Sequence, residues 1–208
     1  MPPRQGDLFA AQPWGQAEAT ALEPELPLLQ HQLTAWQGRL AQHQAPLFAA
    51  STLSSSDQQG VLLSVEQLSV GQEGPAELAQ RFDPLALQPQ PLSFWRWPNP
   101  VLRGAALYVV LDRPAGLEHP LVLYIGETGR AEQRWKGEHD CKDYLAAYGE
   151  ALQKANLTSR LSIGFWGDVP SQTRPRRTLE TALIRRWLPA FNKETRGRWA
   201  TPFTATVG

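Results

Sequence analysis

The chain has 208 residues, 42% of them hydrophobic, which suits one or two domains with a proper core. Its formal charge is zero but uneven: residues 1–100 hold 4 basic and 9 acidic residues, and residues 101–208 hold 16 and 11. One cysteine, Cys141, excludes a disulfide framework and argues against a cysteine-based zinc site. With no run near the ~20 apolar residues of a membrane helix and no apolar secretory signal, we expect a cytoplasmic protein.

The N-terminal part predicts a flexible tail and then a partly helical region. Residues 1–25 are rich in Pro, Gln, Ala and Gly, a composition typical of disorder. A helix is expected from residue 27, because apolar residues recur there at steps of three and four. These residues are Leu26, Leu29, Leu33, Trp36 and Leu40.

The region up to residue 100 has weaker signals. Residues 51–60 predict a loop, 61–70 a strand, and 75–82 a short helix with a proline at its start. Five prolines between residues 83 and 100 argue against regular structure there. We therefore interpret 26–100 as an irregular, partly helical accessory region.

The second half predicts alternating strands and helices. Strands are expected at 107–112, 121–126 and 161–166, the first two as a hairpin. Residues 130–154 show helical spacing interrupted by glycines, so one helix or two are possible. A further helix over 178–188 ends before Pro189. The order predicts a small α+β domain over 101–208.

Several residues with side chains that can transfer protons or bind ligands occur among these predicted elements. Tyr124-Ile125-Gly126 is preceded by Ala106-Leu107-Tyr108, and Arg134 stands eight residues after Gly126. Glu180 follows, with Asn192 twelve residues later. Tyrosine can relay a proton, arginine can grip a phosphate through a planar fork of donors, and glutamate can bind Mg²⁺. Each of these residues alone is more often an ordinary packed or surface residue.

Together, these residues resemble the GIY-YIG nuclease family over residues 102–199. The resemblance implies a small, three-stranded, mainly antiparallel sheet flanked by helices, and a metal-dependent endonuclease that hydrolyses DNA in repair, recombination or replication. It implies proton transfer by Tyr108 or Tyr124, phosphate binding by Arg134, binding of Mg²⁺ or Mn²⁺ by Glu180, and support from Asn192. Which tyrosine accepts the proton stays open.

Two departures from the family pattern leave a second interpretation. Ala106-Leu107-Tyr108 replaces Gly-Ile-Tyr, and His139 lies one position later than the family's His or Tyr. One position rotates a helical side chain by ~100°. The alternative is a non-catalytic module of the same fold that binds nucleic acid or a sliding clamp.

Two further features point to macromolecular partners. Basic residues crowd around Glu180 and predict contacts with nucleic-acid phosphates; we single out Arg174, Arg176, Arg177, Arg185, Arg186 and Lys193. In the tail, Gln5-Gly6-Asp7-Leu8-Phe9 resembles the peptide with which bacterial replication and repair proteins bind the sliding clamp. The resemblance implies clamp contacts by Gln5, Asp7, Leu8 and Phe9, although such short motifs also arise by chance.

Overall fold

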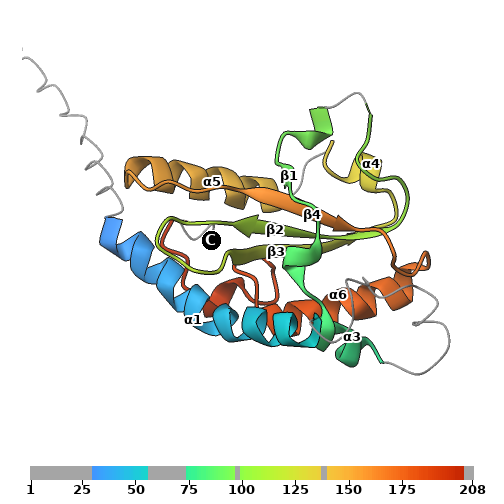
Figure 1. The fold of residues 1–208 in the computed structure, drawn as a ribbon. Helices are drawn as coiled ribbons and strands as arrows, with labels where there is room; N and C mark the ends of the chain where they lie inside the picture. The colour runs from blue at the N-terminus through green and yellow to red at the C-terminus, as the bar shows by residue number, and fades with distance from the viewer. Residues whose placement is uncertain (1–29, 56–73, 97–98, 137–139, 204–208) are drawn as a thin grey trace, which may run out of the picture.

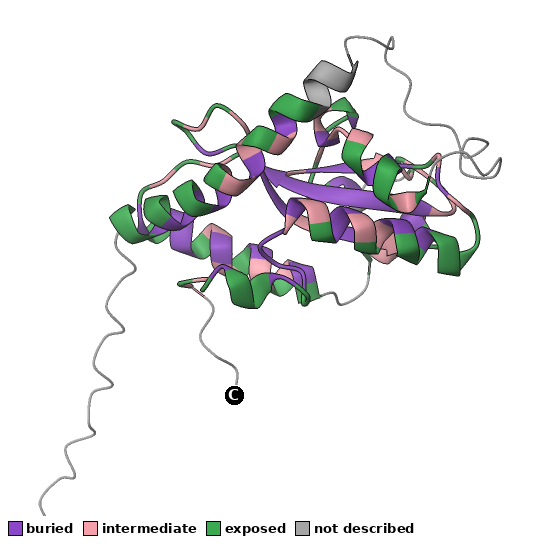
Figure 2. Ribbon diagram, turned by 90° about the horizontal axis from the view of Figure 1, so that it is seen from below, coloured by how far each residue is buried: buried purple, intermediate pink, exposed green. Residues whose placement is uncertain are grey.

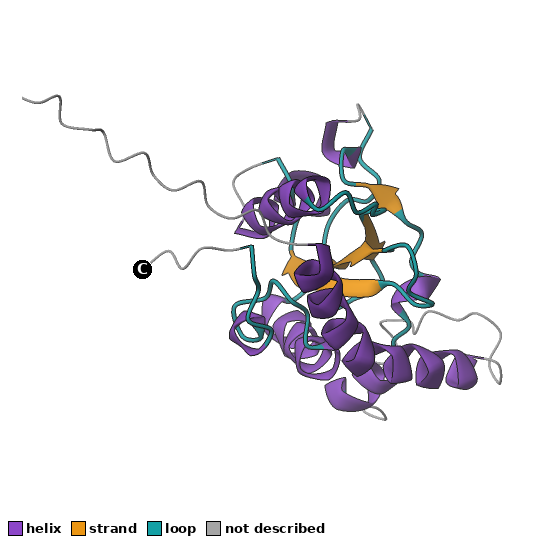
Figure 3. Ribbon diagram, turned by 90° about the vertical axis from the view of Figure 1, so that its left-hand side faces the viewer, coloured by secondary structure: helices purple, strands orange, loops and turns teal. Residues whose placement is uncertain are grey.

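The protein is described here by a computed structural model, which places residues 30–55, 74–96, 99–136 and 140–203 (Figure 1). It is an α+β fold whose four-stranded antiparallel sheet, in the order β1-β4-β2-β3, has helices on both faces (Figure 3). The strands are β1 (Gln90–Pro91), β2 (Ala106–Asp112), β3 (Leu121–Thr128) and β4 (Ser162–Trp166). The helices are α1 (Gln30–Ser55), α3 (Pro75–Arg81), α4 (Ala131–Arg134), α5 (Asp140–Lys154) and α6 (Thr173–Trp187), with single 3₁₀ turns at Pro84–Ala86, Phe94–Arg96 and Arg196–Arg198.

The three strands expected in the second half are confirmed, but the three-stranded sheet is wrong. The fourth strand, β1, comes from the proline-rich segment and pairs with β4 through Gln90 opposite Ile163 and Pro91 opposite Ser162. Proline lacks an amide donor and is tolerated at a sheet edge, where β1 lies. A two-residue strand leaves no alternation for a sequence pattern to reveal.

Two hydrophobic clusters hold the helices against the sheet. Side chains of α5 pack on one face, and those of α6 and α3 pack on the other. All seven residues of β2 are buried because this strand is covered on both faces (Figure 2). The short helix predicted over 75–82 is confirmed as α3, which begins with Pro75 and buries Leu78 and Ala79.

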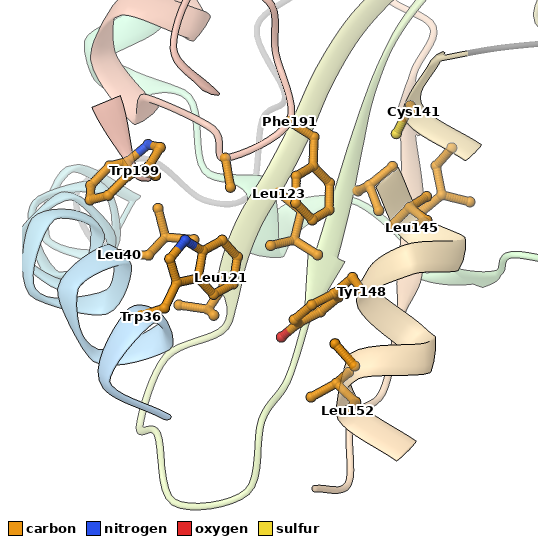
Figure 4. Packing of buried hydrophobic residues seen from close by; sticks show 14 of the residues in the cluster. Trp36, Leu40, Leu121, Leu123, Cys141, Leu145, Tyr148, Leu152, Phe191 and Trp199 are labelled. Atoms are coloured by element: carbon orange, nitrogen blue, oxygen red, sulfur yellow. The ribbon is translucent and has the colours of Figure 1, made fainter. Parts of the chain in front are cut away.

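Helix α1 is the part of the accessory region that joins both clusters. Its Trp36 and Leu40 lie in the α5-side cluster (Figure 4), and its Phe48 lies in the α6-side cluster. The predicted helix is confirmed from Gln30, but it runs through Pro46 to Ser55, so the loop predicted at 51–55 is wrong. The rest of that loop, the strand at 61–70 and the tail at 1–25 lie outside the described residues.

A bulge in β3 sets which side chains face the tyrosines. Val110 of β2 pairs with Tyr124, but the next residue, Leu111, pairs with Val122, so Leu123 is left without an opposite residue. One extra residue reverses the alternation of side chains beyond it. Counted along β2 from Tyr108, Tyr124 lies before the bulge and pairs with Val110, two residues after Tyr108, so it faces the same side of the sheet as Tyr108, with the α5-side cluster. The bulge turns Leu123 toward that cluster as well.

The helices of the second half refine the expected boundaries. Residues 130–154 form two helices, α4 and α5. Helix α6 begins at Thr173, five residues earlier than expected, because Pro175 fits within a first turn. It ends at Leu188, whose φ of 44° is left-handed. No helix among the described residues is long and apolar enough to cross a membrane.

Candidate active site

The two tyrosines of the motif lie side by side on adjacent strands. Tyr108 pairs with Gly126 across β2 and β3, and its ring stacks near that of Tyr124, with centroids 6.0 Å apart and planes 19° apart. A Cβ at Gly126 would lie 2.4 Å from the Tyr108 hydroxyl oxygen. Glycine at this position is therefore required by the close approach of the ring.

Both tyrosines are held in the protonated form. Burial, and then the neighbouring Tyr124, raises the pKa of Tyr108 well above its usual value, and Arg134 offsets this only in part. Burial also raises the pKa of Tyr124 to about 12, against a hydrogen bond with the Tyr108 hydroxyl. Tyr108 is fully buried and Tyr124 only partly buried, so Tyr124 is the tyrosine that solvent reaches.

Arg134 lies at the end of the short helix α4 and is bonded to the tyrosine pair. Its Nε donates to the Tyr108 hydroxyl at 3.2 Å. No hydrogen bond to the described residues uses its two terminal nitrogens, and the side chain is only partly buried. The guanidinium thus has donors available for an anion beside the tyrosines.

Glu180 reaches the same end of the sheet from the opposite face. It projects from α6, and its Oε1 accepts a hydrogen bond from the backbone N–H of Glu127 at 2.9 Å. Burial, followed by the charge of Glu127, raises the pKa of Glu180 to about 7. Glu180 in turn raises the pKa of Tyr124, so the two groups interact electrostatically around the edge of β3.

Glu127 is a residue of this cluster that the sequence interpretation missed. Its carboxylate receives Arg176 Nε at 2.8 Å and Arg177 Nε at 3.1 Å, and its own N–H binds Glu180. The position directly after Gly126, at the end of a strand, was visible in the sequence. Its two arginine partners, 49 and 50 residues later, were not. We call Tyr108, Tyr124, Glu127, Arg134 and Glu180 the site cluster.

The basic residues singled out around Glu180 have different environments. Arg176 is 2% exposed and donates hydrogen bonds to Glu127 and to the carbonyls of Pro170 and Ser171. Its guanidinium therefore binds groups within the protein. Arg186 is partly buried on α6, and Lys193 pairs with Asp140 at 2.9 Å on the surface. The remaining three, Arg174, Arg177 and Arg185, are exposed on α6.

Asn192 supports the site through the backbone of β3. Its Oδ1 accepts from the N–H of Ile125 at 3.0 Å, and its Nδ2 donates to the carbonyl of Ile125 at 2.7 Å. The side chain is 3% exposed. It therefore holds the strand between Tyr124 and Gly126, rather than presenting its amide to a phosphate.

The same edge of β3 is closed further along by Gln44 of α1. Its amide exchanges hydrogen bonds with the N–H and carbonyl of Val122, at 2.8 and 3.0 Å, and also donates to the carbonyl of Trp187. Phe191 N–H binds the carbonyl of Leu123. These contacts satisfy an edge strand that would otherwise present free backbone groups.

The other candidate residues do not add to the cluster. His139, Gln5, Asp7, Leu8 and Phe9 lie outside the described residues. Trp187 and Trp199 are buried, as core residues rather than exposed stacking platforms. Cys141 is buried and its thiol pKa is raised by burial, which makes it an unreactive packing residue.

Comparisons with family models, with curated proteins and with solved structures each gave no match.

Proposed function

We propose that the protein is a metal-dependent endonuclease of GIY-YIG type that hydrolyses DNA phosphodiester bonds. One observation carries the proposal. Two tyrosines, an arginine and a glutamate, separated by up to 72 positions between Tyr108 and Glu180, converge at one end of the β2–β3 hairpin. Their chemistry provides a proton acceptor, a phosphate-binding cation and a carboxylate.

Glu180 fits the role of ligand to a hard divalent cation such as Mg²⁺ or Mn²⁺. Its Oε2 accepts no hydrogen bond from a described residue, and burial and the charge of Glu127 raise its pKa, so a bound cation would stabilise its ionised form. No group of three or more His, Cys, Asp or Glu within the described ranges is arranged to hold a metal. One carboxylate is sufficient, because Mg²⁺ commonly keeps water and takes phosphate oxygens as its other ligands. Such an ion would polarise the phosphate and assist the leaving oxygen.

The remaining side chains divide the work around the phosphate. The terminal nitrogens of Arg134, which bond to no described residue, bind the phosphate oxygens and stabilise the charge that develops during attack. Tyr124, the more accessible tyrosine, takes the proton of the attacking water when it is a phenolate. Tyr108 hydrogen-bonds both Tyr124 and Arg134 and so positions them. Asn192 and Gly126 fix β3 so that these groups stay in register.

The setting in DNA repair, recombination or replication is part of the proposal. The tail at residues 5–9, with its clamp-like sequence, would bring the nuclease to a sliding clamp. Attachment to the clamp through this peptide would raise the local concentration of the nuclease at its substrate without any new contact in the site.

The decisive experiment compares the wild-type protein with Glu180→Gln. Both are incubated with supercoiled plasmid and with duplex, flapped and branched oligonucleotides, in Mg²⁺ or in chelator. We expect metal-dependent cleavage that falls more than ~100-fold in the variant, because a carboxylate ligand is removed while shape is kept. Arg113→Gln, at the opposite end of the sheet, is the control.

Two outcomes would contradict the proposal. Full cleavage by Glu180→Gln would show that the site cluster is not the catalyst. Binding to the oligonucleotides with no cleavage by the wild type, at any protein excess and with either metal, would favour the non-catalytic module.

A further inference from the structure

A groove lies between α3 and α6, beside the candidate active site but outside it. It has a volume of about 730 Å³. Most of its lining comes from α6, and Pro75 and Ala76 of α3 supply the rest. Figure 1 shows the two helices next to each other, below the sheet. Because α3 belongs to the segment before residue 101, the groove joins both halves of the sequence.

The lining of the groove is cationic. Arg174, Arg177 and Arg185 contribute three guanidinium groups, and none of the described residues that line it carries a carboxylate. Arg174 and Arg185 are exposed and form no ion pair with a described residue. The chain as a whole has a formal charge of zero, so this concentration of positive charge is a local property of the groove.

The groove is continuous with the site cluster through one residue. Arg177 lines the groove and donates to Glu127 Oε1 at 3.1 Å. The backbone N–H of Glu127 binds Glu180. A polymer lying in the groove therefore passes next to the carboxylate proposed to hold the metal.

We propose that the α3–α6 groove binds the sugar–phosphate backbone of the nucleic acid on one side of the cleaved bond, without reading its base sequence; this inference rests on the proposed function. Exposed arginines neutralise phosphates, and the hydroxyl of Thr181 in the same lining can donate to a phosphate oxygen. Contacts of this kind fix position and carry no sequence information.

The length of the groove fits a short stretch of one strand. Arg174 and Arg185 are eleven residues apart on α6, which is ~16 Å along a helix at 1.5 Å per residue. A strand of B-form DNA advances ~3.4 Å along the axis per nucleotide, so the arginines span about five nucleotides. The substrate should therefore need about five nucleotides beyond the cut on the side of Glu180.

The test measures binding in chelator, which separates it from cleavage. Wild type, the Arg174→Gln/Arg185→Gln double variant and the control double variant Arg113→Gln/Arg160→Gln are titrated into labelled oligonucleotides of two unrelated sequences at several salt concentrations. Arg113 and Arg160 are exposed arginines at the far end of the sheet. We expect the groove variant to bind at least ~10-fold more weakly, with a salt slope smaller by about two, equally for both sequences. The control should bind as the wild type does.

The outcomes separate this inference from the nuclease proposal. If the wild type cleaves and the groove variant binds as the control does, the groove proposal is overturned and the nuclease proposal stands. If groove-dependent binding is found without cleavage, the nuclease proposal falls alone. A groove variant that no longer binds a labelled polyglutamate peptide but still binds nucleic acid as the wild type does would assign the groove to an acidic protein. That result would overturn the inference. A wild type that binds no oligonucleotide overturns both.

Discussion

The two ends of the central hairpin use buried polar groups in opposite ways. At the far end, Asp112 accepts hydrogen bonds from the hydroxyls of Tyr148 and Ser159 and from the N–H of Arg160, and Gln37 of α1 donates to Tyr148. We call Gln37, Asp112, Tyr148 and Ser159 the distal network. Here the buried carboxylate has a partner for each of its oxygens.

The site cluster leaves bonding capacity open. Glu180 uses one oxygen and Arg134 one of its nitrogens in bonds to described residues. A satisfied buried carboxylate stabilises a fold, whereas an unsatisfied carboxylate and guanidinium near solvent are suited to bind something else. Buried groups with perturbed pKa values occur at both ends of the hairpin. What distinguishes the candidate site is therefore its unused hydrogen-bond donors and acceptors.

Removal of the distal carboxylate should have the largest effect on stability. Asp112→Ala leaves two hydroxyls and an amide without their acceptor, and we expect it to lower the free energy of unfolding by about 4 kcal/mol. Cleavage per folded molecule should be unchanged. Denaturant unfolding alongside cleavage by the folded fraction checks both, and Asp112→Asn, which keeps an acceptor oxygen, should lose less. A large loss of cleavage at full folding would break the division between the two ends.

The rate of cleavage should depend on pH through the ionisation of two groups in the site cluster. A base is active when deprotonated, and burial raises the pKa values of Glu180 to about 7 and of Tyr124 to about 12. Both must lose a proton, so activity should increase with pH, through pH 7 and onward, by up to about 100-fold between pH 7 and 9. Cleavage rates over this range measure it, with binding followed in parallel. A rate that falls above pH 7 would exclude Tyr124 as the proton acceptor.

The two amides on the edge of β3 offer a matched pair. Asn192→Ala frees the N–H and carbonyl of Ile125, and Gln44→Ala frees those of Val122 together with the carbonyl of Trp187. Each variant should lower the free energy of unfolding by about 2 kcal/mol. Only Asn192 binds the residue between Tyr124 and Gly126, so only the Asn192 variant should also slow cleavage in the folded protein. Equal effects of both variants on cleavage would show that the edge acts as one structural unit.

The smallest expected difference in stability is between alanine substitutions at Gly126 and at Gly149. In Gly126→Ala the new Cβ would meet the Tyr108 ring at 2.4 Å, and we expect a loss of about 1.5 kcal/mol together with slower cleavage. Gly149→Ala, in α5 with nothing within 4 Å of the new Cβ, should instead stabilise by about 0.5–1 kcal/mol. Thermal unfolding compares them. A neutral Gly126→Ala would mean that the tyrosine ring moves freely.

The sequence by itself determined the elements with strong periodicity. The strands near residues 107–112, 121–126 and 161–166 and the helix of Leu33, Trp36 and Leu40 were predictable, because alternation and helical spacing are local properties. The order of Tyr108, Tyr124, Arg134 and Glu180 also singled them out, since a resemblance depends on residue type and spacing. That these four side chains lie close together in the fold was an expectation that the sequence alone could not establish.

Tertiary structure alone decided the rest, because it depends on contacts between distant segments. The register between β2 and β3 put Tyr124 beside Tyr108, and pairing with Ser162 and Ile163 made a strand of Gln90–Pro91. Asn192, to which the resemblance assigns a supporting role, binds the backbone of Ile125, a contact that its position in the sequence does not reveal. Arg176 and Arg174 look alike in sequence, yet one is buried against Glu127 and the other lines a groove, since the direction of each side chain on α6 follows from what the sheet and α3 place around it.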